Sequence, residues 1–266
     1  MFKCLFAKTP KDLYGWFGDY SSWTELAAET SGYDAAVILE KTKNAILKVK
    51  NGTAVYERDS LNLPKKEYPF PLISFLMHSA ALKKRPLRVL DFGGSLGSTY
   101  FQVKEFLTEG VCASWNVVEQ EHYVTCGKAH FEDDQLKFYT SIAEALKSTE
   151  IDLVILSSVV QYLEKPHEFL KELVAYQFPF LLFDRTAFHH GDQDRLTLQI
   201  VPPQIYAASY PSWFFNQQGF LSHFQNHYQQ IAEFSSYVKG EETMLINGKE
   251  LGYDKGFYFI NSSGYA

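Results

Sequence analysis

The sequence has few cysteines and no long apolar run. Cys4, Cys112 and Cys126 are far apart and odd in number, so they form neither a disulfide framework nor a metal-ligand spacing, and we interpret them as small buried apolar residues. No stretch approaches the ~18 apolar residues that a membrane span needs. The apolar start in residues 1–8 is too short for a signal peptide, so we expect a cytoplasmic protein without a membrane span.

Dense blocks of lysine and arginine are also missing. The 266 residues include 25 Lys and Arg against 31 Asp and Glu, and the resulting net charge of -6 disfavours a nucleic-acid partner and favours a small molecule. Apolar residues make up 46% of the chain and charged residues 21%, as in ordinary folded proteins. A chain of this length can form one substantial core, or one domain with a small appendage.

One stretch organises the chain. Residues 87–92 form a short apolar run that ends in Asp91-Phe92, and Gly93, Gly94 and Gly97 follow directly. Apolar residues then recur at helical spacing from Tyr100 onward. The pattern predicts a buried strand, a glycine turn and a helix, with main-chain N–H groups open to a ligand.

The spacing of these glycines indicates which ligand. A dinucleotide fingerprint would need glycine at position 92, where Phe92 stands. The motif is instead Asp-x-Gly-x-x-x-Gly, and the acidic residue suits a ligand with ammonium and hydroxyl groups. It resembles the first motif of class I S-adenosylmethionine-dependent methyltransferases, in which the residues matching Asp91, Gly93, Gly94 and Gly97 bind the cofactor.

A carboxylate follows about twenty residues after the glycine turn. The run 114–119 is a predicted strand that ends in Glu119, at the distance where nucleotide-binding folds place the acid that binds the ribose. One carboxylate can accept hydrogen bonds from both ribose hydroxyls. The alternative is that Glu119 is an ordinary solvated residue at a strand end.

Strand and helix patterns alternate from residue 71 onward. The segments are 114–119, 121–130, 136–139, 141–148, 151–157, 165–175 and 178–184. Such alternation predicts a doubly wound, Rossmann-like α/β sheet with helices on both faces, and a ligand beyond the carboxyl ends of its strands.

The segment 151–163 is the third motif of the same resemblance. In the family, the strand-end carbonyl here contacts the ammonium group of the methionine moiety, which implies Ser157 or Ser158 in this chain. Gln161 and Tyr162 stand where many family members have His or Glu, so a general base at this point is not implied. Ser141, after the third strand, is a candidate for facing the adenine.

Further stretches extend the resemblance over nearly the full length of the chain. Val118-Glu119-Gln120, Asp184-Arg185-Thr186, 194–199 and 206–213 resemble a family of bacterial methyltransferases often associated with surface-polysaccharide biosynthesis. The resemblance implies S-adenosylmethionine as cofactor, S-adenosylhomocysteine as product and a mostly parallel seven-stranded sheet whose last strand, in the C-terminal hairpin, is antiparallel. It also places Gln120 beside the cofactor, and it names no acceptor.

Residues 1–70 differ in character from the methyltransferase domain expected over 71–266. Ser22 and Glu25 have the spacing of a capping box, and Asp34 is a plausible cap for a second helix. We therefore predict an N-terminal helical cap that has no strand of its own.

The insertion 185–213 is the expected acceptor site, because so long a connection in a compact domain is usually a lid or a binding loop. Its histidines, His189 and His190, are candidate proton acceptors with Asp184. Adjacent histidines point in different directions and no ligand set is completed nearby, so no metal is predicted. The candidate substrate-binding residues are Arg185, Gln199, Tyr206, Tyr210 and Trp213.

These observations predict a methyltransferase that O-methylates a small hydroxylated, sugar-like substrate. One alternative is a nicotinamide-dependent sugar oxidoreductase, against which Phe92 and the missing Tyr-x-x-x-Lys motif argue. The other is a cofactor-binding scaffold protein without turnover.

Overall fold

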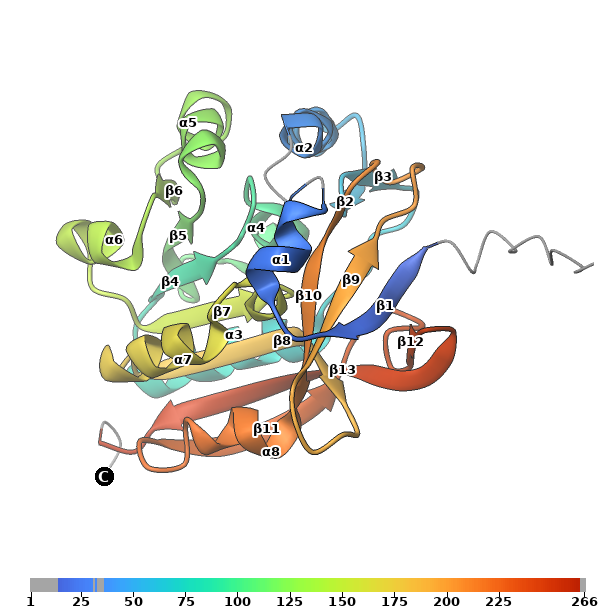
Figure 1. The fold of residues 1–266 in the computed structure, drawn as a ribbon. Helices are drawn as coiled ribbons and strands as arrows, with labels where there is room; N and C mark the ends of the chain where they lie inside the picture. Colours follow the sequence, from blue (N-terminus) through green and yellow to red (C-terminus); the bar gives the residue numbers. More distant parts are fainter. Residues whose placement is uncertain (1–13, 31, 33–35, 264–266) are drawn as a thin grey trace, which may run out of the picture.

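The structure, a computed structural model, describes residues 14–30, 32 and 36–263 (Figure 1). Cys4 and the predicted cap Asp34 lie outside these residues. The strands are β1 (Gly15–Tyr20), β2 (Tyr56–Arg58), β3 (Leu61–Leu63), β4 (Leu87–Phe92), β5 (Cys112–Val118), β6 (Leu136–Tyr139), β7 (Leu153–Ser157), β8 (Phe180–His189), β9 (Arg195–Ile200), β10 (Ser209–Asn216), β11 (Tyr228–Ser235), β12 (Met244–Ile246) and β13 (Lys249–Asn261). The helices are α1 (Trp23–Ala28), α2 (Ala36–Lys50), α3 (Phe70–Lys83), α4 (Ser98–Val103), α5 (Glu121–His130), α6 (Ile142–Ser148), α7 (Pro166–Ala175) and α8 (Gln217–Ser222), with 3-10 turns η2 (Lys104–Phe106) and η3 (Val160–Tyr162).

A parallel sheet forms the centre of the molecule. Strands β6, β5, β4, β7 and β8 lie side by side in that order, and each neighbouring pair is parallel. The chain winds outward in one direction from β4 to β5 and β6, and in the other from β7 to β8. The order therefore reverses between β4 and β7, where open α/β sheets bind their ligands.

Two apolar cores cover the two faces of this sheet. Val89 and Leu153 belong to one core with residues of α3, α4 and α5, whereas Leu90 and Val154 belong to the other with residues of α6, α7 and α8. Successive strand residues point to opposite faces, so two buried faces require the nearly continuous apolar runs that these strands have. The doubly wound α/β arrangement is confirmed.

The last long strand is antiparallel, as expected. Strand β13 pairs antiparallel with β8 on one side and with β11 on the other. The order β6-β5-β4-β7-β8-β13-β11 thus runs through seven strands.

The sheet is nevertheless larger and more mixed than predicted. In the described part of the chain, eleven strands join one sheet rather than seven. Strands β10, β9, β1 and β12 continue from β8 and return to β13, so that β8, β10, β9, β1, β12 and β13 close into a ring (Figure 1). We call this ring the barrel; β8 and β13 are long enough to serve both the open sheet and the barrel.

The N-terminal segment is only partly helical. Helix α1 begins at the predicted capping box, where the Glu25 main-chain N–H donates to Ser22 Oγ over 3.2 Å, and α2 follows. The expectation that this segment lacks strands is wrong, because β1 enters the barrel and β2 and β3 form a separate hairpin. The division at residue 70 stays a prediction. None of the helices within the described ranges is long and apolar enough to cross a membrane.

Candidate functional site

A cavity of about 1090 Å³ lies at the carboxyl ends of β4 and β7 and beside the middle of β8. Its lining includes residues from the glycine turn after β4, from η3, from the β2–β3 hairpin and from every strand of the barrel. The cavity thus lies between the sheet edge where the strand order reverses and one end of the barrel.

The glycine turn brings main chain close to this cavity. Gly93 has a φ of +69°, and a Cβ there would lie 2.3 Å from a methyl carbon of Val159. A Cβ at Gly94 would lie 2.5 Å from the carboxyl carbon of Asp91. Both glycines line the cavity, whereas Gly97 does not. Gly97 precedes α4 as its N-cap at a φ of +89°, and a Cβ there would lie 3.2 Å from a methyl carbon of Leu136. Side chains at 93 and 94 would therefore disturb the wall of the cavity.

Asp91 lies at the end of β4 and lines the cavity, although only 1% of its surface is exposed. The indole Nε1 of Trp115 donates to its Oδ2 over 3.1 Å. Burial, with a smaller contribution from the negative charge of Glu119, raises the pKa of Asp91 to about 7. A cationic ligand would favour the ionised form of this carboxyl.

Glu119 follows β5 and is tied to the glycine turn. Its carboxylate accepts hydrogen bonds from the main-chain N–H of Ser95 over 3.2 Å and of Gln120 over 2.8 Å. Burial raises the pKa of Glu119. Ser95 lines the cavity while Glu119 and Gln120 do not, so Glu119 stands directly behind the cavity wall.

Ser141 does not face the cavity. Its hydroxyl oxygen accepts a hydrogen bond from the Glu144 main-chain N–H over 3.1 Å and caps α6. The structure thus gives it a helix-capping contact in place of the expected contact with an adenine.

The end of β7 and the middle of β8 bring Ser157, Ser158 and Asp184 together on the cavity wall. Ser157 Oγ donates to Asp184 Oδ2 over 3.1 Å, and the Ser158 N–H donates to the Asp184 main-chain oxygen over 2.9 Å. Burial raises the pKa of Asp184 to about 6, and Arg185 and Ser157 counteract that rise. Asp184 is thus a carboxyl that can hold or release a proton near neutral pH.

A bulge in β8 explains why two consecutive residues face the same cavity. The register with β13 shifts so that Asp184 and Arg185 together oppose the single residue Gly256, and Arg185 has a φ of +50°. In a regular strand these two side chains would point to opposite faces. Both line the cavity here.

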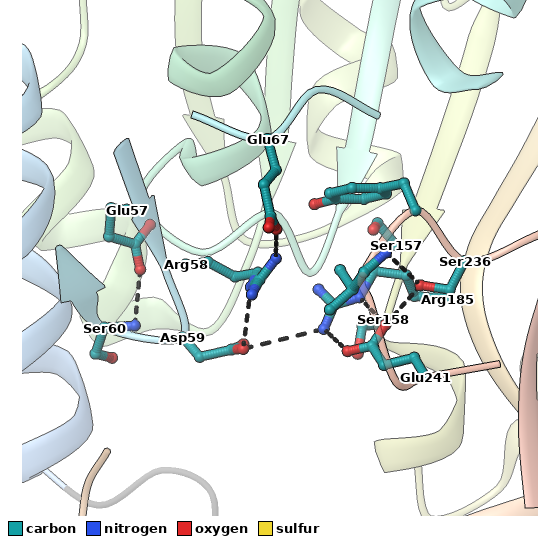
Figure 2. Close-up of polar contacts among 12 residues, drawn as sticks. Glu57, Arg58, Asp59, Ser60, Glu67, Ser157, Ser158, Arg185, Ser236 and Glu241 are labelled. Carbon is teal, nitrogen blue, oxygen red and sulfur yellow. Dashed lines mark hydrogen bonds and ion pairs between the residues drawn. The ribbon is translucent and has the colours of Figure 1, made fainter. Parts of the chain in front are cut away.

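Arg185 is the centre of a charged cluster that the sequence did not reveal (Figure 2). Its guanidinium donates to both carboxylate oxygens of Glu241, over 2.8 Å and 2.6 Å, and lies 4.0 Å from Asp59. Ser236 Oγ also donates to Glu241. Asp59 comes from the β2–β3 hairpin, more than a hundred residues earlier in the chain, so no local signal places it beside Arg185.

The predicted acceptor residues divide into two groups. Gln199, Tyr206 and Tyr210 line the cavity, and the hydroxyl groups of the two tyrosines lie 3.2 Å apart. Trp213 is directed elsewhere: its Nε1 donates to the Leu163 main-chain oxygen over 3.1 Å, and its ring stacks on Trp23. Trp213 therefore supports the wall behind the cavity.

His189 and His190 lie away from the cavity. We expected β8 to end at Asp184, but it continues to His189, and five residues of extended chain span roughly 16 Å. The ring nitrogens of His189 bond the turn between β8 and β9, through the Gln193 main-chain oxygen at 2.6 Å and the Gly191 N–H at 3.2 Å. His190 packs on the ring of Tyr253. The structure does not bring the two histidines to the predicted site.

Further cavity residues lie outside the predicted motifs. They carry polar groups from the hairpin, from η3, from the connection between β11 and β12 and from β13: Glu57, Arg58, Asp59, Gln161, Tyr237, Glu241 and Asp254. Within the described residues, no group of three or more His, Cys, Asp or Glu is arranged to hold a metal ion.

No protein-family profile and no curated protein matches the chain. Among solved structures, the N-terminal domain of EvdMO1, crystallised in the presence of S-adenosylhomocysteine and D-fucose, is 12% identical, with a TM-score of 0.47 over 86% of this chain and 97% of that one. Magnesium protoporphyrin IX methyltransferase from Synechocystis is 13% identical, with a TM-score of 0.44 over 87% and 99%. CalS10, an amino pentose methyltransferase from Micromonospora echinaspora, is 10% identical, with a TM-score of 0.44 over 71% and 89%. These similarities leave the function to be inferred from the chain's own residues.

Proposed function

We propose that the chain is an S-adenosylmethionine-dependent methyltransferase that O-methylates a small hydroxylated, sugar-like acceptor. The observation that carries this proposal is the placement of Asp91, Gly93 and Gly94 on the wall of one cavity, at the point where the strand order reverses, with Glu119 directly behind them. A role in surface-polysaccharide biosynthesis belongs to the same proposal and rests on the resemblance of the sequence.

The residues at the sheet edge fit this cofactor. Main chain at Gly93 and Gly94 can lie against a flat nucleoside because no Cβ intervenes. Glu119 would accept both ribose hydroxyls if its carboxylate turned from the Ser95 N–H toward the cavity. Asp91 and Ser157 then lie on the side where the sulfonium and ammonium charges of the methionine moiety would sit.

The cofactor would supply a methyl group that moves from sulfur to the acceptor oxygen, with S-adenosylhomocysteine as product. The protein aligns the acceptor and removes its proton. Asp184 suits the second task, because it lies on the cavity wall and its pKa of about 6 leaves it ionised at neutral pH. Ser157, which donates to Asp184, would hold the carboxylate in place.

Thermal unfolding with two ligands tests the proposal. S-adenosylhomocysteine at a hundred-fold excess over its Kd should stabilise the protein by about 2.7 kcal/mol, and NADH should not. Glu119→Ala should lose the effect, whereas Glu109→Ala, at an exposed position away from the cavity, should retain it.

Three outcomes would contradict parts of the proposal. A shift with NADH alone would favour the oxidoreductase. Binding of S-adenosylhomocysteine without transfer of labelled methyl to any of a broad panel of hydroxylated glycans would favour a scaffold without turnover. Full binding by Glu119→Ala would remove that residue from the cofactor site.

A further inference from the structure

The charges around the cavity are unbalanced. Among the residues that the structure describes, those lining the cavity include six carboxyl side chains, two guanidinium groups and no lysine or histidine. The carboxyl groups belong to Glu57, Asp59, Asp91, Asp184, Glu241 and Asp254.

Both guanidinium groups already have carboxylate partners. Arg58 pairs with Glu67, and Arg185 donates two parallel hydrogen bonds to Glu241 (Figure 2). A phosphate or carboxylate on the acceptor would therefore meet no unpaired cation among the described lining residues and would face several carboxyls. In a partly buried site such like-charge contacts cost far more than they do in water.

Four buried acceptor atoms on the lining have no hydrogen-bond partner among the described residues: Glu57 Oε2, Gln161 Oε1, Gln199 Oε1 and Asp254 Oδ1. One buried donor on the lining, Trp16 Nε1, also lacks a partner among these residues. Asp254 is 5% exposed, and its Oδ1 has none. Gln161 is 3% exposed; its Nε2 donates to Ser158 Oγ over 3.3 Å and to the Arg185 main-chain oxygen over 3.1 Å, while its Oε1 has no donor. Buried polar atoms normally have a partner. Four of these five atoms are acceptors, so the ligand that completes them must bring mainly donors.

We propose that the acceptor is a cationic amino sugar without phosphate or carboxylate, and that its ammonium group is bound by Asp254. This inference rests on the proposed function and specifies its substrate class. Asp254 suits an ammonium group because its unpartnered oxygen lies on the same wall as Glu241 and Asp184. Burial and the neighbouring Glu241 carboxylate raise the pKa of Asp254 well above its usual range, and a bound ammonium group would favour the ionised form. Gln161 Oε1 would accept from a hydroxyl of the same ring, beside the Asp184 carboxylate that takes the proton.

The binding of glycosides to the full chain, saturated with S-adenosylhomocysteine, tests the preference for an amino sugar. Isothermal titration at pH 7.5 would compare methyl hexopyranosides that carry one amino group at C2, C3, C4 or C6 with their N-acetyl counterparts. Two anionic analogues, the 6-phosphate and the uronate of the methyl hexopyranoside, are titrated in the same way. We expect at least one amino glycoside to bind about ten-fold or more tightly than its N-acetyl counterpart, because hydrogen bonds to charged groups are the stronger ones.

Variants identify the residue responsible. Asp254→Asn should remove the preference for the amine while the affinity for S-adenosylhomocysteine is kept, and this retained affinity also reports that the variant is folded. Asp254→Glu should keep part of the preference, because it retains the carboxylate. Glu233→Gln removes the same charge from an exposed pair with Lys255 outside the cavity and should change nothing.

Several results would overturn the inference. These are tighter binding of the phosphate or the uronate, equal binding of the N-acetyl compounds, and no binding of any amine by a protein that binds S-adenosylhomocysteine. An unchanged preference in Asp254→Asn would also overturn it. If S-adenosylhomocysteine itself does not bind, the failure lies with the proposed function.

Discussion

Asp184 is the residue whose chemistry depends most on its local backbone. The bulge in β8 brings it to the cavity beside Ser157, and burial raises its pKa to about 6. A base must be ionised to accept a proton, so we expect kcat to rise with pH up to about 6 and then to level off. Asp184→Asn should lower kcat by about 10²-fold or more and abolish this rise, as measured by labelled-methyl transfer from pH 5 to 8.

Ser157→Ala provides the matched control for Asp184. The Ser157 hydroxyl stabilises the ionised carboxylate, so its removal should move the rise in kcat to higher pH and leave the plateau nearer the wild-type value. An unchanged pH profile in Asp184→Asn would show that another group takes the proton.

Single residues were predictable where a motif ties them to a strand end. Asp91 with Gly93, Ser157, and Asp184 mark the ends of three predicted strands, and the structure brings all four residues to one cavity. Asp254 was not predictable in this way. Its importance comes from neighbours distant in sequence and from an unpartnered oxygen, neither of which the residue type or its spacing reveals.

At the scale of elements, the turn after β4 depends on the absence of a side chain. A methyl group at Gly94 would lie 2.5 Å from the Asp91 carboxyl carbon and would displace it. We expect Gly94→Ala to raise the Kd for S-adenosylhomocysteine by about ten-fold or more, as measured by titration calorimetry. Gly110→Ala, where no atom lies within 4 Å of the added carbon, should bind like wild type. Normal affinity in Gly94→Ala would mean that the ligand does not lie against this turn.

The elements that local patterns missed are the ones stabilised by distant partners. Strand β1 contains Gly15 and Gly18, which are poor strand formers, and it exists because it pairs with β9, which follows about 180 residues later. Strand β10, Ser209–Asn216, lies largely within the stretch 185–213 that was expected to be a lid or a binding loop, and it exists because it pairs with β8 and β9. Tertiary pairing overrides local periodicity in both cases.

At the scale of the whole molecule, the structure joins a conventional sheet to a barrel through two shared strands. The sheet contributes Asp91, Gly93 and Ser157, whose positions follow from α/β winding. The barrel contributes Gln199 and Asp254, and it closes over the carboxyl edge of the sheet. Alternation along the chain therefore predicted the strand ends that line one half of the cavity, where we propose that the cofactor binds. The other half arises from strand pairings between distant segments.

The buried carboxyls also affect the stability of the whole fold. Burial raises the pKa of Asp91 and of Glu57 to about 7, whereas both would titrate near 4 in the unfolded chain. The folded state therefore holds more protons than the unfolded state, and the stabilisation present at low pH is lost as the pH rises through about 7.

We expect the free energy of unfolding in urea, without ligand, to fall by roughly 1–2 kcal/mol between pH 6.5 and pH 8. Below pH 6.5 the lowered pKa of His223 acts in the opposite direction, so the test stays above that value. Asp91→Asn should flatten this slope, while Glu109→Gln, at an exposed position, should not. A stability that rises between pH 6.5 and pH 8 would contradict the proposed burial of these carboxyls.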